Sequence, residues 1–163
     1  MIVHLAGGIA LHEGRLLLVA SHYPNQPQPL WNLPGGRQLP GELLVETVVR
    51  EVFEETGLRA VADELAYVSE SYDGDRHYVT AAFLVSVRTA RSAVLSPSTS
   101  SGQAQSKDHV VTVEWVPLDE VRERIVVAVV RDPLLAYLQG VLDRRYAGYH
   151  EAGITIEWPD DSV

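Results

Sequence analysis

The sequence predicts a single mixed α/β domain in which helices lie on both faces of a central sheet. Short apolar or alternating stretches, typical of strands, are interleaved along the chain with stretches of helical period. Glycine-containing turns join several strand candidates, so the sheet should include antiparallel pairs and be mixed. The chain has 163 residues, of which 46% are hydrophobic, which suffices for one core, and we expect one domain over residues 1–163.

The N-terminal half is expected to contain a strand pair, a polar loop and a helix. Apolar runs over residues 2–10 and 15–20 flank His12-Glu13-Gly14, a pattern typical of a β-hairpin with a glycine turn. A polar, proline-containing loop follows. From about Glu42 to Thr56 apolar residues recur with a helical period, and Gly57 supplies the stop signal of the helix.

The C-terminal half is expected to alternate strands and short helices. The expected strands cover residues 60–72, 76–88, 109–116 and 154–158. The expected helices cover residues 118–125 and a segment from Asp132-Pro133 to Leu142, with the proline in its first turn. Residues 91–108 are rich in small polar side chains and should form a flexible surface loop, or alternatively a substrate lid. The last strand, ITIEW, could supply an edge for a homodimer.

Composition restricts the classes of partner. A formal net charge of -9 argues against a nucleic-acid polymer as ligand, because such ligands require a cationic surface. The chain contains no cysteine, which excludes thiolate metal sites and fits a cytoplasmic protein. The N-terminal segment lacks a basic region, and no stretch approaches the length of a membrane span, so we expect neither a secretory signal nor a membrane partner.

Three carboxylates gather near the end of the first expected helix. Glu51, Glu54 and Glu55 lie within one arc of about 100°, away from the apolar face. Like charges at this spacing repel each other, and anions at a helix C-terminus oppose the helix dipole. The alternative is an ordinary acidic face exposed to solvent. Such a face usually includes several lysine or arginine residues, whereas Arg50 is the one basic residue within this helix. A hard divalent cation such as Mg²⁺ or Mn²⁺ would relieve both penalties.

The loop before the helix fits the same interpretation. The segment Leu33-Pro-Gly-Gly-Arg37 leaves backbone groups unobstructed by side chains. A glycine carbonyl there could bind a cation, and glycine N–H groups could approach phosphate oxygens.

Together these residues resemble the Nudix box, GX5EX7REUXEEXGU, in which U is aliphatic. Residues 36–58 contain every fixed position: Glu42 follows Gly36 after five residues, and Arg50 follows after seven more. A chance match anywhere in the chain has a probability of about one in a million. Residues 31–36 and 114–120 also resemble the usual surroundings of this box.

The resemblance implies an α/β/α sandwich around a mixed sheet, with the box forming a loop-helix-loop. It also implies hydrolysis of a nucleoside diphosphate linked to another group X, the substrate being a (d)NTP or another small nucleotide. A dinucleoside polyphosphate, ADP-ribose and a non-catalytic nucleotide-sensing role are the alternatives. An isomerase of isoprenoid diphosphates would call for a cysteine, which this chain lacks.

The resemblance further assigns roles to residues of the box. The ligands of Mg²⁺, or of Mn²⁺ in its place, would be Gly35 through its carbonyl, Glu51, Glu54 and Glu55. Arg50 would orient a ligand carboxylate, and Glu42 would pair with Arg50 or steady the loop. Catalysis would depend on Arg50, Glu51 and Glu54.

The general base and the substrate contacts are expected partly outside the box. The base would be a box glutamate or a later acid, with Glu114 the first candidate and Asp75 and Asp108 further ones. The substrate contacts would be Gly36, Arg37, Tyr23 and Trp31. Aromatic side chains can stack on a nucleobase, and His22, Tyr72 and Tyr78 are further candidates, with ordinary packing as the alternative for each.

Overall fold

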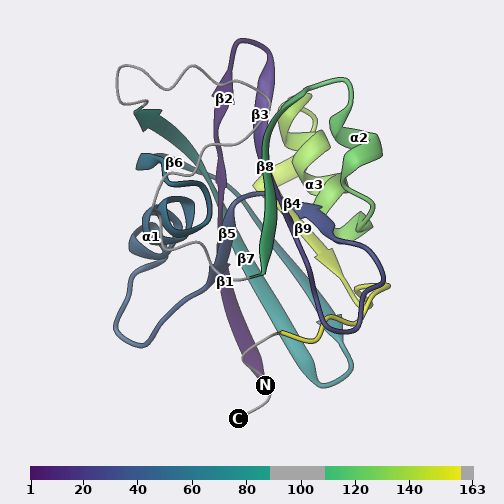
Figure 1. Cartoon of the computed structure of the whole chain (residues 1–163). Coiled ribbons are helices and arrows are strands. Elements are labelled where there is room, and N and C mark those ends of the chain that lie inside the picture. The colour runs from purple at the N-terminus through teal and green to yellow at the C-terminus, as the bar shows by residue number, and fades with distance from the viewer. Residues whose placement is uncertain (89–108, 159–163) are drawn as a thin grey trace.

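The computed structural model describes residues 1–88 and 109–158. The loop expected over residues 91–108 and the candidate base Asp108 lie outside the described residues. The described chain forms two sheets with helices on either side, which confirms the α/β/α arrangement (Figure 1).

The first sheet has five strands and is mixed. Its spatial order is β5 (Gly35–Arg37), β1 (Ile2–Ile9), β7 (Arg76–Arg88), β6 (Arg59–Asp73) and β9 (Tyr146–Tyr149). Strand β1 pairs parallel with β7 and antiparallel with β5, while β6 pairs antiparallel with β7 and parallel with β9. The pair joined by the Asp-Gly turn is therefore confirmed, and both strands lie at the centre of the domain.

The second sheet is built around one strand. Strand β3 (Arg15–Ser21) pairs antiparallel with its three neighbours, β2 (Leu11–His12), β4 (Leu30–Asn32) and β8 (Val110–Pro117). The hairpin expected from residues 2–20 forms only at its tip, between β2 and β3, whereas residues 2–9 belong to the first sheet. The expectation was wrong because a local pattern identifies a strand, while its pairing partner here is 75 residues away, as in the pair Ile2 and His77.

The helices cover opposite sides of the sheets (Figure 1). Helix α1 (Leu44–Thr56) buries Val48 and Val52 against Ala6, Leu17, Phe83 and Val85. Helices α2 (Val121–Arg124) and α3 (Ala128–Leu138) pack on the other side, where the core contains Ile9, Leu16, Leu18, Tyr67, Val121 and Leu134. The apolar period of α1 thus predicted the burial of Val48 and Val52, but Val45 and Phe53 are exposed. The expectation that the three acids lie away from the buried side was wrong for Glu51 and Glu55, which are buried because they face β5.

Helix α3 differs from its prediction at both ends. It begins at Ala128, so that Pro133 lies inside the helix, and it ends at Leu138 instead of Leu142. An interior proline removes one helical hydrogen bond and costs about 3 kcal/mol. Burial of Pro133, Leu134 and Leu135 on the same helix offsets this cost. Helix α2 is also shorter than the expected segment over residues 118–125, because residues 118–120 form a turn.

The expected C-terminal strand ITIEW is not a strand. Residues 150–158 adopt no regular structure. The N–H of Ala152 donates to the carbonyl of Tyr72 in β6 at 2.7 Å, but the backbone of Thr155 and Glu157 bonds to a side chain instead of a strand. Asn25 donates from Nδ2 to the carbonyl of Thr155 at 2.7 Å and accepts from the N–H of Glu157 at 3.0 Å. The sequence argument for a homodimer through this edge therefore loses its basis. The sequence analysis missed β9, which follows a short 3-10 helix over Asp143–Arg145. It also missed the short strands β4 and β5, which lie in the segment expected to be a loop.

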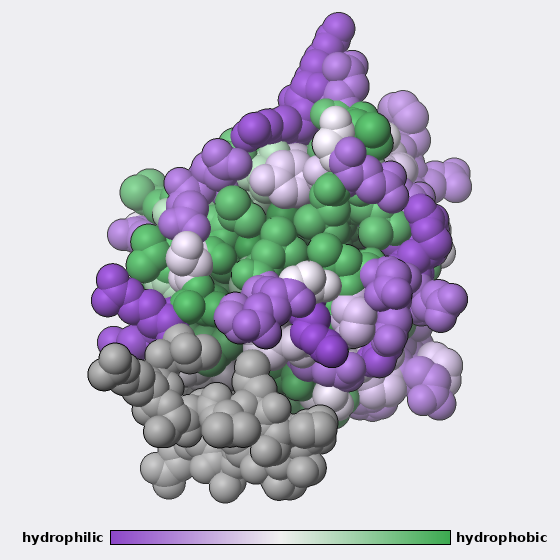
Figure 2. Space-filling model, turned by 90° about the horizontal axis from the view of Figure 1, so that it is seen from above, coloured by the Kyte–Doolittle hydropathy of each residue, from purple (hydrophilic) through white to green (hydrophobic). Residues whose placement is uncertain are grey.

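No helix within the described residues has the length and apolarity to cross a membrane. Seen from above, one face of the molecule carries hydrophobic residues in its middle and hydrophilic residues around its rim (Figure 2).

We predict that Gly35→Ala destabilises the fold. A Cβ at this position of β5 would lie 2.3 Å from the carbonyl oxygen of Ala6 and 2.7 Å from the Cα of Gly7, both backbone atoms of β1. Overpacking of this kind costs about 1–3 kcal/mol, measurable by denaturant unfolding. The matched control is Gly7→Ala, whose added Cβ would have its nearest neighbour at 3.6 Å. Equal stability of the two variants would contradict the prediction.

Candidate active site

Helix α1 is fixed at both ends by local signals. At its start, the carboxylate of Glu46 accepts a hydrogen bond from the N–H of Leu43 at 2.7 Å, which satisfies one of the first amides of the helix. Gly57 ends the helix in the left-handed conformation, with φ of 73°, and donates to the carbonyl of Phe53. These two ends place Arg50, Glu51 and Glu54 on the turns facing the preceding loop.

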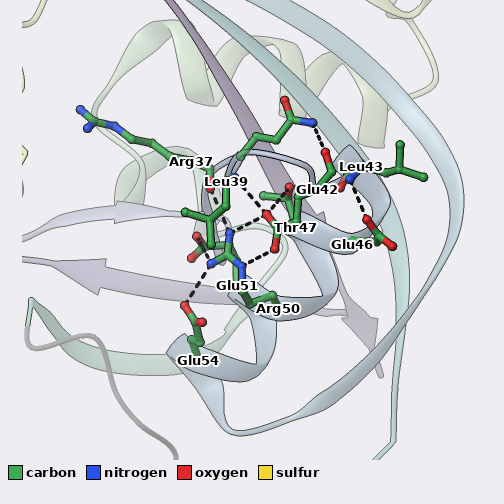
Figure 3. A network of polar contacts seen from close by, with 10 residues as sticks. Arg37, Leu39, Glu42, Leu43, Glu46, Thr47, Arg50, Glu51 and Glu54 are labelled. Atoms are coloured by element: carbon green, nitrogen blue, oxygen red, sulfur yellow. Dashed lines mark hydrogen bonds and ion pairs between the residues drawn. The ribbon is translucent and has the colours of Figure 1, made fainter.

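Arg50 is the centre of the polar network in this site (Figure 3). Its Nε donates to Glu42 Oε1 at 2.6 Å, and its Nη2 donates to Glu42 Oε2 at 3.0 Å, a two-point contact. Its Nη1 donates to Glu51 at 2.7 Å and to Glu54 at 3.1 Å. Its Nη2 also donates to the carbonyl of Arg37 at 3.0 Å. One guanidinium therefore connects three carboxylates and the backbone of the loop.

Glu42 links this network to the loop. Its carboxylate also accepts hydrogen bonds from the hydroxyl of Thr47 at 2.9 Å and the N–H of Leu39 at 3.1 Å. The hydrogen bonds from Arg50 are the main cause that lowers the pKa of Glu42 from 4.5 to about 2, and they raise the pKa of Arg50. The pairing of Glu42 with Arg50 that the box implied is present, and Glu42 steadies the loop as well.

The two glycines of β5 bring the backbone against the acids of α1. The N–H of Gly35 donates to Glu55 Oε2 at 2.8 Å. A Cβ on Gly36 would lie 2.6 Å from the Glu51 carboxylate, so a larger residue at position 36 would displace that carboxylate. Glu51 and Glu55 are buried, with exposed fractions of 1% and 6%, while the Glu54 side chain is 30% exposed. Glu54 is thus the acid of this group with the best access to solvent.

A pocket extends from the two glycines and Glu55 across the sheet. Of the predicted substrate contacts, Gly36, Tyr23 and Trp31 line it, and so does Tyr78. The side chain of Arg37 extends away from the Arg50 network (Figure 3), and its guanidinium lies 4.5 Å from the ring centroid of Trp158, another lining residue. Neither His22 nor Tyr72 is among the described residues that line this pocket.

The candidate bases outside the box have other contacts. Glu114 accepts hydrogen bonds from both terminal nitrogens of Arg124, at 3.0 and 3.2 Å, and the guanidinium of Arg124 lies 5.2 Å from the ring centroid of Trp31. Asp75 accepts a hydrogen bond from the N-terminal amine of Met1 through its backbone carbonyl. Neither acid is among the described residues lining the pocket. The role of Glu114 as general base stays a prediction.

Sequence reasoning missed several residues of the pocket. They are the hydroxyl-bearing residues Ser69, Ser71 and Thr80 and the C-terminal residues Ala152, Ile154, Ile156 and Trp158. The alternation in ITIEW was a usable signal, because every second residue of this segment does face the pocket. It was assigned to a sheet edge because sequence period alone does not identify what a side chain faces.

The acids of α1 offer oxygen donors of the kind that a divalent cation binds. Among the residues that the structure describes, no group of three or more acidic or histidine side chains is arranged to hold a metal ion. The chemistry of the donors nevertheless fits Mg²⁺, which prefers carboxylate and carbonyl oxygens. Glu51 and Glu54 converge on a single nitrogen of Arg50, and Gly36 leaves the space that the Glu51 carboxylate occupies.

The geometry agrees with comparisons to known proteins. Residues 4–138 match the model of the NUDIX domain. A MutT-like protein of Streptomyces ambofaciens is 30% identical over 123 residues, which are 76% of this chain and 68% of that protein. A Bacillus subtilis (strain 168) protein provisionally named an 8-oxo-dGTP diphosphatase is 46% identical over 52 residues, 32% of this chain and only 33% of that protein. A NUDIX hydrolase structure from Nitrosomonas europaea superposes with a TM-score of 0.71 at 21% identity, covering 90% of this chain and 93% of that one.

We predict that Glu42 makes stability depend on pH in the acid range. Because its pKa is lowered from 4.5 to about 2, its contribution is complete above pH 4.5 and is lost as the pH falls toward 2. The difference in free energy of unfolding between the parent and Glu42→Gln should be constant above pH 4.5 and shrink below it. Denaturant titrations between these limits measure it. A difference that grows on acidification would contradict the assignment.

Proposed function

Because the chain belongs to the NUDIX domain family, we propose that it hydrolyses the pyrophosphate bond of a nucleoside diphosphate linked to X, with a (d)NTP or similar small nucleotide as substrate. The observation that carries the proposal is the convergence of Glu51 and Glu54 on Arg50 beside the glycines of β5, at one end of an aromatic-lined pocket. The name of the Bacillus relative supports the same class of substrate.

We propose Mg²⁺, with Mn²⁺ as a substitute, as the cofactor of this site. The residues that would hold it are Glu51, Glu54 and Glu55, together with the carbonyl of Gly35. Such a cation neutralises charge on a diphosphate and lowers the pKa of water. A cytoplasmic location fits the cysteine-free composition.

The residues of this chain supply position and charge. The bonds from Arg50 hold the carboxylates of Glu51 and Glu54 together, and Glu42 fixes Arg50 from its other side. The missing side chains at Gly35 and Gly36 let β1 and the Glu51 carboxylate pack against β5. Both glycines also line the pocket, and an anionic diphosphate would approach the site from that side, with its charge offset by the proposed cation. Water then attacks phosphorus, the bond to the bridging oxygen breaks, and the products are a nucleoside monophosphate and phosphorylated X.

The base that accepts the proton of this water is proposed to be Glu54. Both Glu51 and Glu54 accept a hydrogen bond from Arg50, but the Glu54 side chain is 30% exposed and can reach solvent water, whereas the Glu51 side chain is 1% exposed. Glu114 is the second candidate, and it would have to leave its two hydrogen bonds with Arg124 to act.

We predict that Glu54→Gln or Glu55→Gln abolishes turnover dependent on Mg²⁺ while the fold stays intact. Each substitution keeps the shape of the side chain and removes an anionic oxygen donor. Loss of a charged group in such a site lowers kcat by about 10²-fold or more. The matched control is Glu46→Gln in the same helix, since glutamine can also accept the hydrogen bond from the N–H of Leu43. Activity of the two site variants within a few fold of the parent would rule out the metal assignment.

Glu114→Gln distinguishes the two candidate bases. If Glu54 is the base, we expect this variant to keep kcat within a few fold and to keep the acid limb of the pH-rate profile. Loss of the acid limb together with a decrease in kcat of about 10²-fold would instead assign the base to Glu114. Arg124→Gln removes the same ion pair from its other side and controls for effects on the packing of Trp31.

A further inference from the structure

The far end of the pocket differs in chemistry from the end at the box. Strands β6 and β7 contribute four hydroxyl-bearing residues to it, Ser69, Ser71, Tyr78 and Thr80. In the antiparallel register Ser69 is opposite Thr80 and Ser71 is opposite Tyr78, so the four side chains form one continuous patch on the same sheet face. Each hydroxyl can both donate and accept a hydrogen bond without carrying charge.

Two polar groups in this region lack partners within the described chain. The hydroxyl of Tyr78 and the Nε1–H of Trp158 are buried and have no hydrogen-bond partner among residues 1–88 and 109–158. A buried polar group without a partner is costly, and a ligand that supplies the missing partner recovers this cost. Both residues line the pocket, so a ligand held there could supply hydrogen bonds to them.

The charged residues that line the pocket disfavour an anionic occupant at this end. Its charged lining residues within the described chain are Glu55, Glu70 and Asp73, all acidic. Glu70 is held by His77 at 2.6 Å, and Asp73 accepts a hydrogen bond from Thr155 at 2.8 Å. The guanidinium of Arg37 lies 4.5 Å from the ring centroid of Trp158 but is not among the described lining residues. A second phosphate group at this end would therefore meet acidic side chains in the wall itself, whereas a neutral ring that forms hydrogen bonds would not be repelled.

The remaining wall is the C-terminal segment, residues 152–158. Ala152, Ile154, Ile156 and Trp158 face the pocket, while the intervening Thr155 and Glu157 bond through their backbone to Asn25. The side-chain amide of Asn25 contacts the backbone of both residues, and this holds Ile154, Ile156 and Trp158 toward the pocket. Gln26 adds a hydrogen bond to the carbonyl of Thr155 at 2.9 Å. Asn25 is thus a positioning residue for an apolar wall opposite the hydroxyl patch.

We propose that this end of the pocket is the subsite for an uncharged nucleobase, whose polar edge is read by the hydroxyl patch and Trp158 and whose ring is enclosed by the wall that Asn25 positions. The inference rests on the proposed function and specifies which part of the substrate lies where. An aromatic heterocycle combines the required apolar faces with a hydrogen-bonding edge. The phosphates would then extend toward Gly35, Gly36 and the acids of α1.

The test measures binding separately from turnover. Calorimetry with AMP, GMP, CMP and UMP would determine the base preference of the parent, Tyr78→Phe and Asn25→Ala, with inorganic pyrophosphate as the probe that lacks a base. We expect Tyr78→Phe to weaken the preferred nucleotide by roughly tenfold and to reduce the preference among bases, because one hydrogen bond is lost. Asn25→Ala should weaken all four nucleotides, and the affinity for pyrophosphate should stay unchanged in both variants.

The matched control is Tyr72→Phe, which removes the hydroxyl of a tyrosine on the same strand pair that stacks on His77 and is absent from the described pocket lining. An unchanged base preference in Tyr78→Phe, or an equal loss for all four bases, would overturn the subsite. A change in pyrophosphate affinity as large as that for nucleotides would do the same. Turnover of the triphosphates by the parent is followed in parallel. Its absence counts against the proposed function and leaves the binding test of the subsite valid.

Discussion

Arg50 is the constraint on which the candidate site depends. Its guanidinium bonds to Glu42, Glu51 and Glu54 and to the carbonyl of Arg37, and thereby joins the helix to the loop that precedes it. Without the guanidinium of Arg50, the buried carboxylate of Glu51 would lose this ion pair. A buried charge without compensation is strongly destabilising. The same contact brings the carboxylates of Glu51 and Glu54 to one nitrogen, where the proposed divalent cation would find two of its oxygen donors. Stability and the proposed chemistry therefore share one interaction.

The pocket joins parts of the chain that are far apart in sequence. Glycines of β5 and Glu55 form the end at the box, strands β6 and β7 form the hydroxyl patch, and residues 152–158 form the apolar wall. Asn25, in the loop between β3 and β4, bonds to that wall across 130 residues of sequence. Such an assembly separates two tasks. The box supplies chemistry common to many phosphate substrates, and the distant segments provide a surface that could select the group attached to the phosphates.

Local patterns predicted a large part of this fold. Helix α1, the β6 and β7 pair and the strand β8 agree with their predictions because each is specified by side-chain period and by adjacent turn residues. The predictions were wrong where a distant partner decided the outcome. Strand β1 pairs with β7 instead of continuing a hairpin, and Pro133 lies inside α3 because that helix buries Leu134. The helix boundaries followed burial more closely than they followed the proline signal.

The sequence alone determined the identity and order of the polar groups in the box, since seven fixed positions within residues 36–58 leave little room for another interpretation. Helical geometry then places Glu51, Glu54 and Glu55 on one face. Only the tertiary structure decided the partners of groups outside the box. Glu114 pairs with Arg124, Tyr78 lies beside Ser71 in the pocket, and the alternation of ITIEW faces that pocket instead of a sheet edge. The physical reason is the distance along the chain over which each interaction acts. Helix period and helix caps depend on neighbouring residues, whereas strand pairing and burial depend on residues far away in the sequence.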